Sequence, residues 1–88
     1  MHEYSLLKDL IHKIETIAHE NKTQKVLGVR VKLGALSHIS PDHFREHFTH
    51  AVVGTLAEGA RVEIETLTDM SDPHAQDIIL DSVELVEP

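Results

Sequence analysis

The chain contains no cysteine, no tryptophan and no long uninterrupted apolar run. Without cysteine there can be no disulfide, no thiolate catalysis and no cysteine-ligated zinc or iron–sulfur site. No apolar run approaches the roughly 20 residues that a transmembrane helix needs. Residues 1–4 lack the basic start of a secretory signal. We therefore expect a cytoplasmic protein of one small domain, residues 1–88, with no membrane contact.

Basic and aromatic residues are also scarce. Eight Lys and Arg residues stand against 15 Asp and Glu, which gives a net charge of −7, and the only aromatic residues are two Phe and one Tyr. An acidic surface repels phosphate backbones, and so few aromatic rings leave no platform on which bases could stack. We expect no nucleic-acid partner. Histidine, by contrast, is abundant, with eight residues.

Motifs of enzymatic catalysis are absent as well. No serine lies in a nucleophile elbow, and there is no glycine-rich phosphate loop. Glu63 and Glu65 alternate with apolar residues, which indicates the solvent face of a strand rather than an acid–base pair. The chain is therefore not expected to be an enzyme.

Two stretches have the periodicity of amphipathic helices. In residues 4–20 apolar side chains recur at spacings of three and four, and the pattern ends at residues 21–23. Ser40 and Pro41 predict the start of a second helix, which ends near Gly54, because Ser caps free N–H groups and Pro suits the first helical position. The predicted apolar stripes are Leu6, Leu7, Leu10, Ile14, Ile17 and Ala18 in the first helix and Phe44, Phe48, Ala51 and Val52 in the second.

Three other stretches have the period of two that is typical of half-buried strands: residues 24–34, 60–66 and 78–86. In the third stretch Asp81 falls on the same parity as the apolar residues, so its register stays open. The predicted core-facing residues are Leu27, Val29, Val31 and Leu33 in the first strand, Ala60, Val62, Ile64 and Thr66 in the second, and Val83 and Leu85 in the third.

The order helix–strand–helix–strand–strand predicts an α+β fold. We expect a two-layer domain in which two helices pack on one face of a three-stranded mixed sheet. The helix between the first two strands allows a right-handed crossover and a parallel pair. The polar segment 68–77 is long enough for the third strand to return antiparallel.

The amino terminus has the donors of a metal chelate. The α-amine of Met1 and the amide nitrogen of His2 can close a five-membered ring on an ion, and that amide and the His2 imidazole Nδ1 can close a six-membered one. Planar nitrogen donors suit Ni(II) or Cu(II). The Glu3 amide or another side chain would complete the square. The alternative is that a histidine at position two is incidental, since most chain termini are frayed.

The other histidines offer weaker candidates. His43, His47 and His50 are spaced by four and three on the second predicted helix and could hold a zinc or nickel ion, although a solvated polar face is the favoured interpretation. His74 is the candidate for a remote fourth ligand of the amino-terminal site. His12 and His19 are predicted on a solvated helix face, and His38 in a loop.

Five segments in a fixed order resemble the HypA/HybF family of hydrogenase/urease nickel-incorporation proteins. The resemblance covers nearly the whole chain except residues 68–77. The segments are Met1–Ser5, Val29–Ser37, Ile39–Asp42 followed by Phe44 and Phe48, Ala57–Glu65, and Asp81–Leu85.

The resemblance implies a nickel metallochaperone that helps to mature [NiFe]-hydrogenase and, in some relatives, urease. It places the metal at Met1, His2 and Glu3, with Glu3 tied also to nickel transfer or partner docking. The implied partners are a nickel-handling GTPase of the HypB type and the hydrogenase large subunit. The implied fold agrees with the order of elements predicted above.

One departure from the family is large. Its members insert a zinc-binding segment with two Cys-x-x-Cys pairs between the second and third strands, whereas this chain has only residues 68–77 there and no cysteine. No zinc is expected through cysteine ligands, and the zinc lobe was either lost naturally or removed by design. The alternative function is therefore an adaptor of the same fold that acts by protein docking, with a degenerate metal site.

Overall fold

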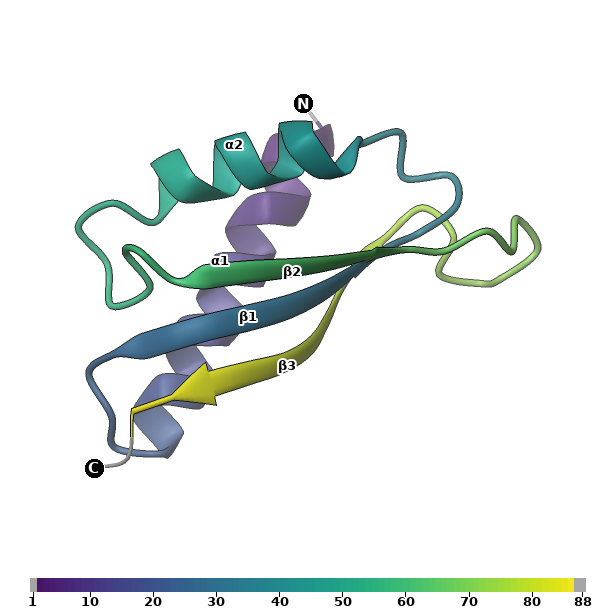
Figure 1. The fold of residues 1–88 in the computed structure, drawn as a ribbon. Helices are drawn as coiled ribbons and strands as arrows, with labels where there is room; N and C mark the ends of the chain where they lie inside the picture. Colours follow the sequence, from purple (N-terminus) through teal and green to yellow (C-terminus); the bar gives the residue numbers. More distant parts are fainter. Residues whose placement is uncertain (1, 87–88) are drawn as a thin grey trace.

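The computed structural model describes residues 2–86, with side chains from Ser5 onward. In this part of the chain two helices and three strands follow one another in the predicted order (Figure 1). The helices are α1 (His2–Glu20) and α2 (Pro41–Ala51), and the strands are β1 (Val26–Leu33), β2 (Arg61–Thr66) and β3 (Ile78–Leu85). Neither described helix combines the length and apolar character needed to cross a bilayer.

The sheet has β1 at its centre, in the order β2-β1-β3. β1 pairs in parallel with β2 and antiparallel with β3. The parallel pair arises because α2 carries the chain from the end of β1 back to the start of β2 (Figure 1). The predicted α+β fold with a mixed sheet is confirmed.

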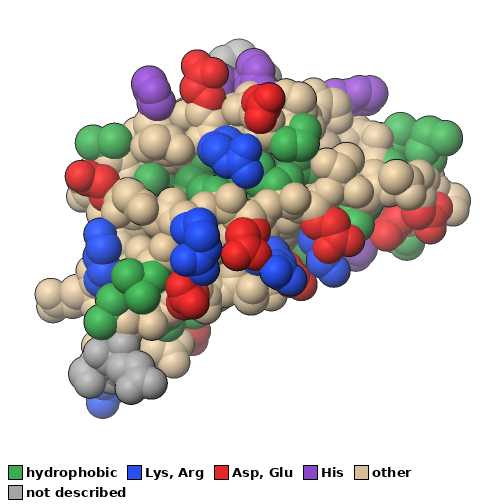
Figure 2. Space-filling model, viewed as in Figure 1, with side chains coloured by type: hydrophobic (Ala, Val, Ile, Leu, Met, Phe, Trp, Pro, Cys, Tyr) green, Lys and Arg blue, Asp and Glu red, His purple; other side chains and the backbone are tan. Residues whose placement is uncertain are grey.

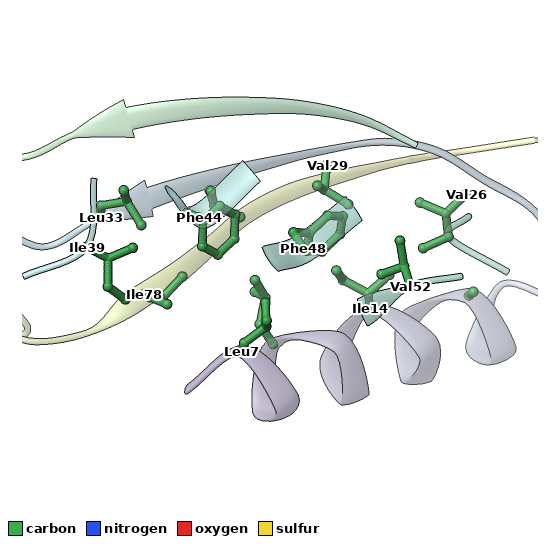
Figure 3. Packing of buried hydrophobic residues seen from close by; sticks show 14 residues of the cluster. Leu7, Ile14, Val26, Val29, Leu33, Ile39, Phe44, Phe48, Val52 and Ile78 are labelled. Atoms are coloured by element: carbon green, nitrogen blue, oxygen red, sulfur yellow. The ribbon is translucent and has the colours of Figure 1, made fainter. Parts of the chain in front are cut away.

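The hydrophobic core lies between the sheet and the two helices. Figure 3 shows Leu7 and Ile14 of α1 pointing toward Phe48 of α2. The rings of Phe44 and Phe48 stack with their centroids 5.8 Å apart, and these side chains are only 2% and 0% exposed. Burying each such ring stabilises the fold by about 1.5–3 kcal/mol, so this aromatic pair fixes α2 on the sheet.

The carboxyl end of α1 is closed by a two-hydrogen-bond cap. The amide of Thr23 donates to the carbonyl of Ala18 at 3.1 Å, and the amide of Lys22 donates to that of His19, also at 3.1 Å. This pattern is the Schellman motif, which needs a residue in the left-handed conformation. Lys22 supplies it with a φ of 56°, although glycine adopts that conformation at lower energy.

Replacing Lys22 by glycine is therefore expected to stabilise the protein by about 0.5–1 kcal/mol, because it removes the strain of a side chain in the left-handed region. Urea denaturation measures the change in the free energy of unfolding. The matched control is Lys8→Gly in the middle of α1, where Lys8 is exposed and glycine should destabilise by about 1 kcal/mol. A destabilisation of similar size in both variants would contradict the assignment of the cap.

The prediction that Leu27 faces the core is wrong. Val26 pairs with Leu85 and Gly28 with Glu84, so Leu27 is an extra residue on β1 and forms a β-bulge. The bulge shifts the alternation: Val26 is fully buried, whereas Leu27 is 43% exposed. The alternation of core-facing and solvent-facing residues correctly predicted that Val29, Val31 and Leu33 are buried, but it could not locate the extra residue.

A second bulge explains why Asp81 did not fit the alternation of β3. Arg30 pairs with Ser82 and Val31 with Leu80, so Asp81 has no partner across the strand. The parity of the core-facing residues changes there, from Ile78 and Leu80 to the predicted Val83 and Leu85. Asp81 is exposed, and its Oδ1 lies 3.7 Å from Nζ of Lys32.

The second helix starts as predicted. The side chain of Ser40 accepts a hydrogen bond from the backbone amide of His43 at 3.2 Å, and Pro41 occupies the first helical turn. Phe44, Phe48 and Val52 are buried, but Ala51, predicted on the same stripe, is exposed. Because Val52 follows Phe48 by four residues and is already seated in the core, the neighbouring Ala51 is turned away from it.

The segment between β2 and β3 packs against the end of β1. The amide of Gly34 donates to the carbonyl of Asp77 at 2.9 Å, and the amide of Leu36 donates to that of Ala75 at 2.7 Å. Ala75 is buried. A Cβ at Gly34 would lie 2.5 Å from the carbonyl carbon of Ala75, so only glycine allows this close approach of two backbones.

Candidate metal centre

The predicted ligands Met1, His2 and Glu3 lie at the edge of what the structure describes. Met1 is outside the described residues, and so are the side chains of His2 and Glu3. The backbone of α1, however, begins at His2. The first four N–H groups of a helix have no intrahelical acceptor. The amides of residues 2 and 3 are therefore not needed for hydrogen bonds within the helix.

Two elements bearing histidines meet the beginning of α1. Leu7 lines a hollow of about 400 Å³ together with Glu46, His47 and His50 of α2. Leu6 lines a larger hollow of about 700 Å³, which also includes His74 from the segment between β2 and β3. The fold thus brings imidazoles from distant parts of the sequence into the lining of hollows along α1.

The helical spacing of His43 and His47 brings their rings together as predicted. The ring centroids are 4.3 Å apart and the ring planes are inclined by 40°. Both side chains are exposed, as is that of His50, and Figure 2 shows histidine side chains along the upper edge, where Figure 1 places α2. Among the described side chains, which begin at Ser5, the structure contains no group of three or more His, Cys, Asp or Glu that could hold a metal ion.

His74, the predicted remote ligand, is engaged with a neighbouring carboxylate. Its Nδ1 lies 3.0 Å from Oδ2 of Asp77, and the two side chains are 68% and 45% exposed. It lines the same hollow as Leu6 and residues of the middle of α1, and its role as a remote ligand stays a prediction. Sequence analysis missed Asp77, although a carboxylate three residues after a histidine in a turn is a recognisable signal.

Of the remaining histidines, His12 also lines the hollow that includes His74. His12 and His19 are exposed on α1, as predicted. They are seven residues apart, which separates them by about 10 Å along the helix. His38 is exposed in the connection between β1 and α2, with a φ of 59°.

The open face of the sheet carries ion pairs. Nη2 of Arg30 lies 2.8 Å from Oε2 of Glu63, and Nη2 of Arg61 lies 2.9 Å from Oε2 of Glu84. The hydrogen bond and positive charge of Arg30 lower the pKa of Glu63. Figure 2 shows acidic and basic side chains intermixed over this face. Glu63 and Glu65 are exposed, which confirms the predicted solvent face.

The family model described as "Hydrogenase/urease nickel incorporation, metallochaperone, hypA" matches residues 1–71. Among curated relatives, the hydrogenase maturation factor HypA of Archaeoglobus fulgidus is 39% identical over 64 residues, which cover 73% of this chain and 58% of the relative. That of Desulfitobacterium hafniense is 41% identical over 68 residues, which cover 76% of this chain and 59% of the relative. This chain thus spans less than two thirds of these relatives.

A solved structure has the same fold. The solution structure of the nickel metallochaperone HypA from Helicobacter pylori superposes with a TM-score of 0.80 at 20% sequence identity, and the alignment covers 100% of both chains. A second solution structure, described as HypA protein, gives a TM-score of 0.76, also at 20% identity. The arrangement of two helices on a mixed sheet is therefore shared with these proteins.

Proposed function

Since the chain belongs to the HypA family of hydrogenase/urease nickel-incorporation metallochaperones, we propose that it carries nickel for the maturation of [NiFe]-hydrogenase and binds Ni(II) through Met1, His2 and Glu3. The ligands are the α-amine of Met1, the amide and imidazole nitrogens of His2, and the amide of Glu3. Nickel is the cargo of this protein rather than a resident cofactor.

The observation that carries this proposal is the start of α1 at His2. Deprotonating a peptide nitrogen normally costs a hydrogen bond, but amides in the first turn of a helix have no intrahelical acceptor. The positive end of the helix dipole also favours an anionic nitrogen at this place. Donors in a plane suit the square geometry of Ni(II), from which Zn(II) gains nothing.

The rest of the proposal follows from the family. Residues 1–88 form the nickel-binding domain, and the segment near 68–77 replaces the zinc-binding insert, so no zinc is held through cysteines. The partners are a nickel-handling GTPase of the HypB type and the hydrogenase large subunit, with urease as a further acceptor. The protein works in the cytoplasm, where these partners are assembled.

Isothermal titration of Ni(II) into the protein with its native, untagged amino terminus tests the proposal. We expect one tightly bound ion per chain and an affinity about 100-fold lower in His2→Ala, which corresponds to about 3 kcal/mol. The matched control is His12→Ala, which removes an exposed imidazole from the same helix and should leave the affinity unchanged.

The adaptor function predicts a different outcome of the same titration. If the untagged protein binds no Ni(II) above background but still associates with the GTPase or the large subunit, the chain acts by docking alone. Equal affinities in His2→Ala and the unaltered protein would move the nickel site away from the amino terminus.

A further inference from the structure

We propose that His43 and His47 form a second metal site, which binds a borderline divalent ion such as Zn(II), Ni(II) or Cu(II) independently of the amino-terminal ligands. Imidazole nitrogen is a preferred donor for these ions, whereas Mg²⁺ and Ca²⁺ favour oxygen. The site is weaker than the proposed amino-terminal one, because two protein ligands leave the other coordination positions to water.

The first argument is the geometry of the pair. Side chains four residues apart lie on one face of a helix, and here the ring centroids are 4.3 Å apart with the planes inclined by 40°. Metal–imidazole bonds are about 2.0–2.1 Å long, so two donor nitrogens on one ion stand about 3 Å apart. Two imidazole rings whose centroids are 4.3 Å apart can place one nitrogen each at that separation.

The second argument is the rigidity of the helix that presents the pair. Ser40 caps its first turn by accepting the hydrogen bond from the amide of His43. On the adjacent face of the helix, Phe44 and Phe48, which directly follow the two histidines in sequence, are buried in the core. The backbone between the two imidazoles is therefore fixed before an ion arrives, which reduces the entropy lost on binding.

The third argument is the charge of the surroundings. Glu46 is exposed between the two histidines in sequence and lines the same hollow as His47. The chain as a whole carries a net charge of −7, so a divalent cation is attracted to its surface. Among the described side chains of α1, His12 and His19 form no comparable pair, since they are too far apart to share one ion.

The experiment uses the folded protein with its α-amine acetylated, so that the amino-terminal chelate cannot form. Zn(II) is titrated while the imidazole resonances are followed by NMR and the heat by calorimetry. We expect saturable binding that shifts the His43 and His47 signals first, and an affinity at least 10-fold lower in both His43→Gln and His47→Gln. The matched control, His12→Gln, removes an exposed imidazole and should bind Zn(II) as the unaltered protein does.

Three outcomes would overturn the proposal. The first is an affinity unchanged in His43→Gln and His47→Gln, and the second is a uniform shift of all histidine signals without saturation. The third is a loss of binding in His50→Gln that is absent from His43→Gln, which would assign the ion to His47 and His50. Because the amine is blocked throughout, none of these results depends on whether Met1 and His2 bind nickel.

Discussion

Selective acetylation of the Met1 α-amine should lower the affinity for Ni(II) by about 1000-fold, equivalent to about 4 kcal/mol. The amine closes the five-membered chelate ring of the proposed site, and an acetylated nitrogen can no longer donate to the metal. Calorimetry measures the affinity, and visible absorption reports whether the ion is in square geometry. The reaction can be directed to the α-amine near neutral pH, because α-amines are intrinsically less basic than lysine side chains.

The fold provides the control for this experiment. Removing a positive charge at the amino end of α1 should leave the helix intact or slightly stabilise it, since the helix dipole disfavours positive charge there. Circular dichroism should therefore be unchanged. If the acetylated protein keeps its full nickel affinity, the amine is not a ligand, and the histidines of α2 become the first place to search.

A one-residue extension would not be an equivalent test. Placing a glycine before Met1 moves the imidazole of His2 to the third position of the chain. The new amine, two amides and the imidazole could then occupy all four corners of a square around Ni(II). We expect such a variant to hold nickel more tightly and to release it more slowly, so an artificial leader residue would disguise the behaviour of the native terminus.

The second large effect concerns stability. Gly34→Ala should lower the free energy of unfolding by about 2–3 kcal/mol, because the new methyl group overlaps the backbone of Ala75 and neither backbone can withdraw without losing its hydrogen bonds. For a domain of this size, that corresponds to a fall in Tm of roughly 10–20 °C. Thermal and urea denaturation measure both quantities.

Gly28→Ala is the matched control for Gly34→Ala. Its Cβ would lie 2.9 Å from the guanidinium Nη2 of Arg61, the mobile end of an exposed side chain, which can rotate away. We expect a change in stability below about 1 kcal/mol, because the substitution weakens only one exposed ion pair. Equal losses in the two variants would show that the close contact at Gly34 has no special importance.

The order and type of the elements could be predicted because each has a strong hydrophobic period. What could not be predicted were the two bulges, at Leu27 and Asp81. An extra residue in a strand depends on how the partner strand is aligned, and alignment between distant segments is not encoded in either strand alone. Asp81 did signal that something was irregular, since a carboxylate has no place on a core face.

The candidate sites likewise include features that the sequence could predict and features that it could not. The proximity of His43 and His47 follows from helical spacing, and the structure confirms it. That His74 lines a hollow along α1 depends on how residues 67–77 fold back across the end of β1, which no local pattern could indicate. The chemistry of Met1, His2 and Glu3 was inferred from donor types and from family resemblance, and the nickel titrations above are its test.

The two ends of the segment 67–77 are hydrogen-bonded to Leu33, the last residue of β1, and to Gly34 directly after it: the amide of Leu67 donates to the carbonyl of Leu33, and the amide of Gly34 donates to that of Asp77, each at 2.9 Å. The chain thus leaves and rejoins the framework at nearly one point. Lengthening such an excursion raises its closure entropy only slowly, by about 0.6 kcal/mol per doubling. The connection between β2 and β3 can accordingly be a whole accessory lobe or a short segment while both strands keep their alignment with β1. This junction is therefore a suitable place to insert a foreign domain.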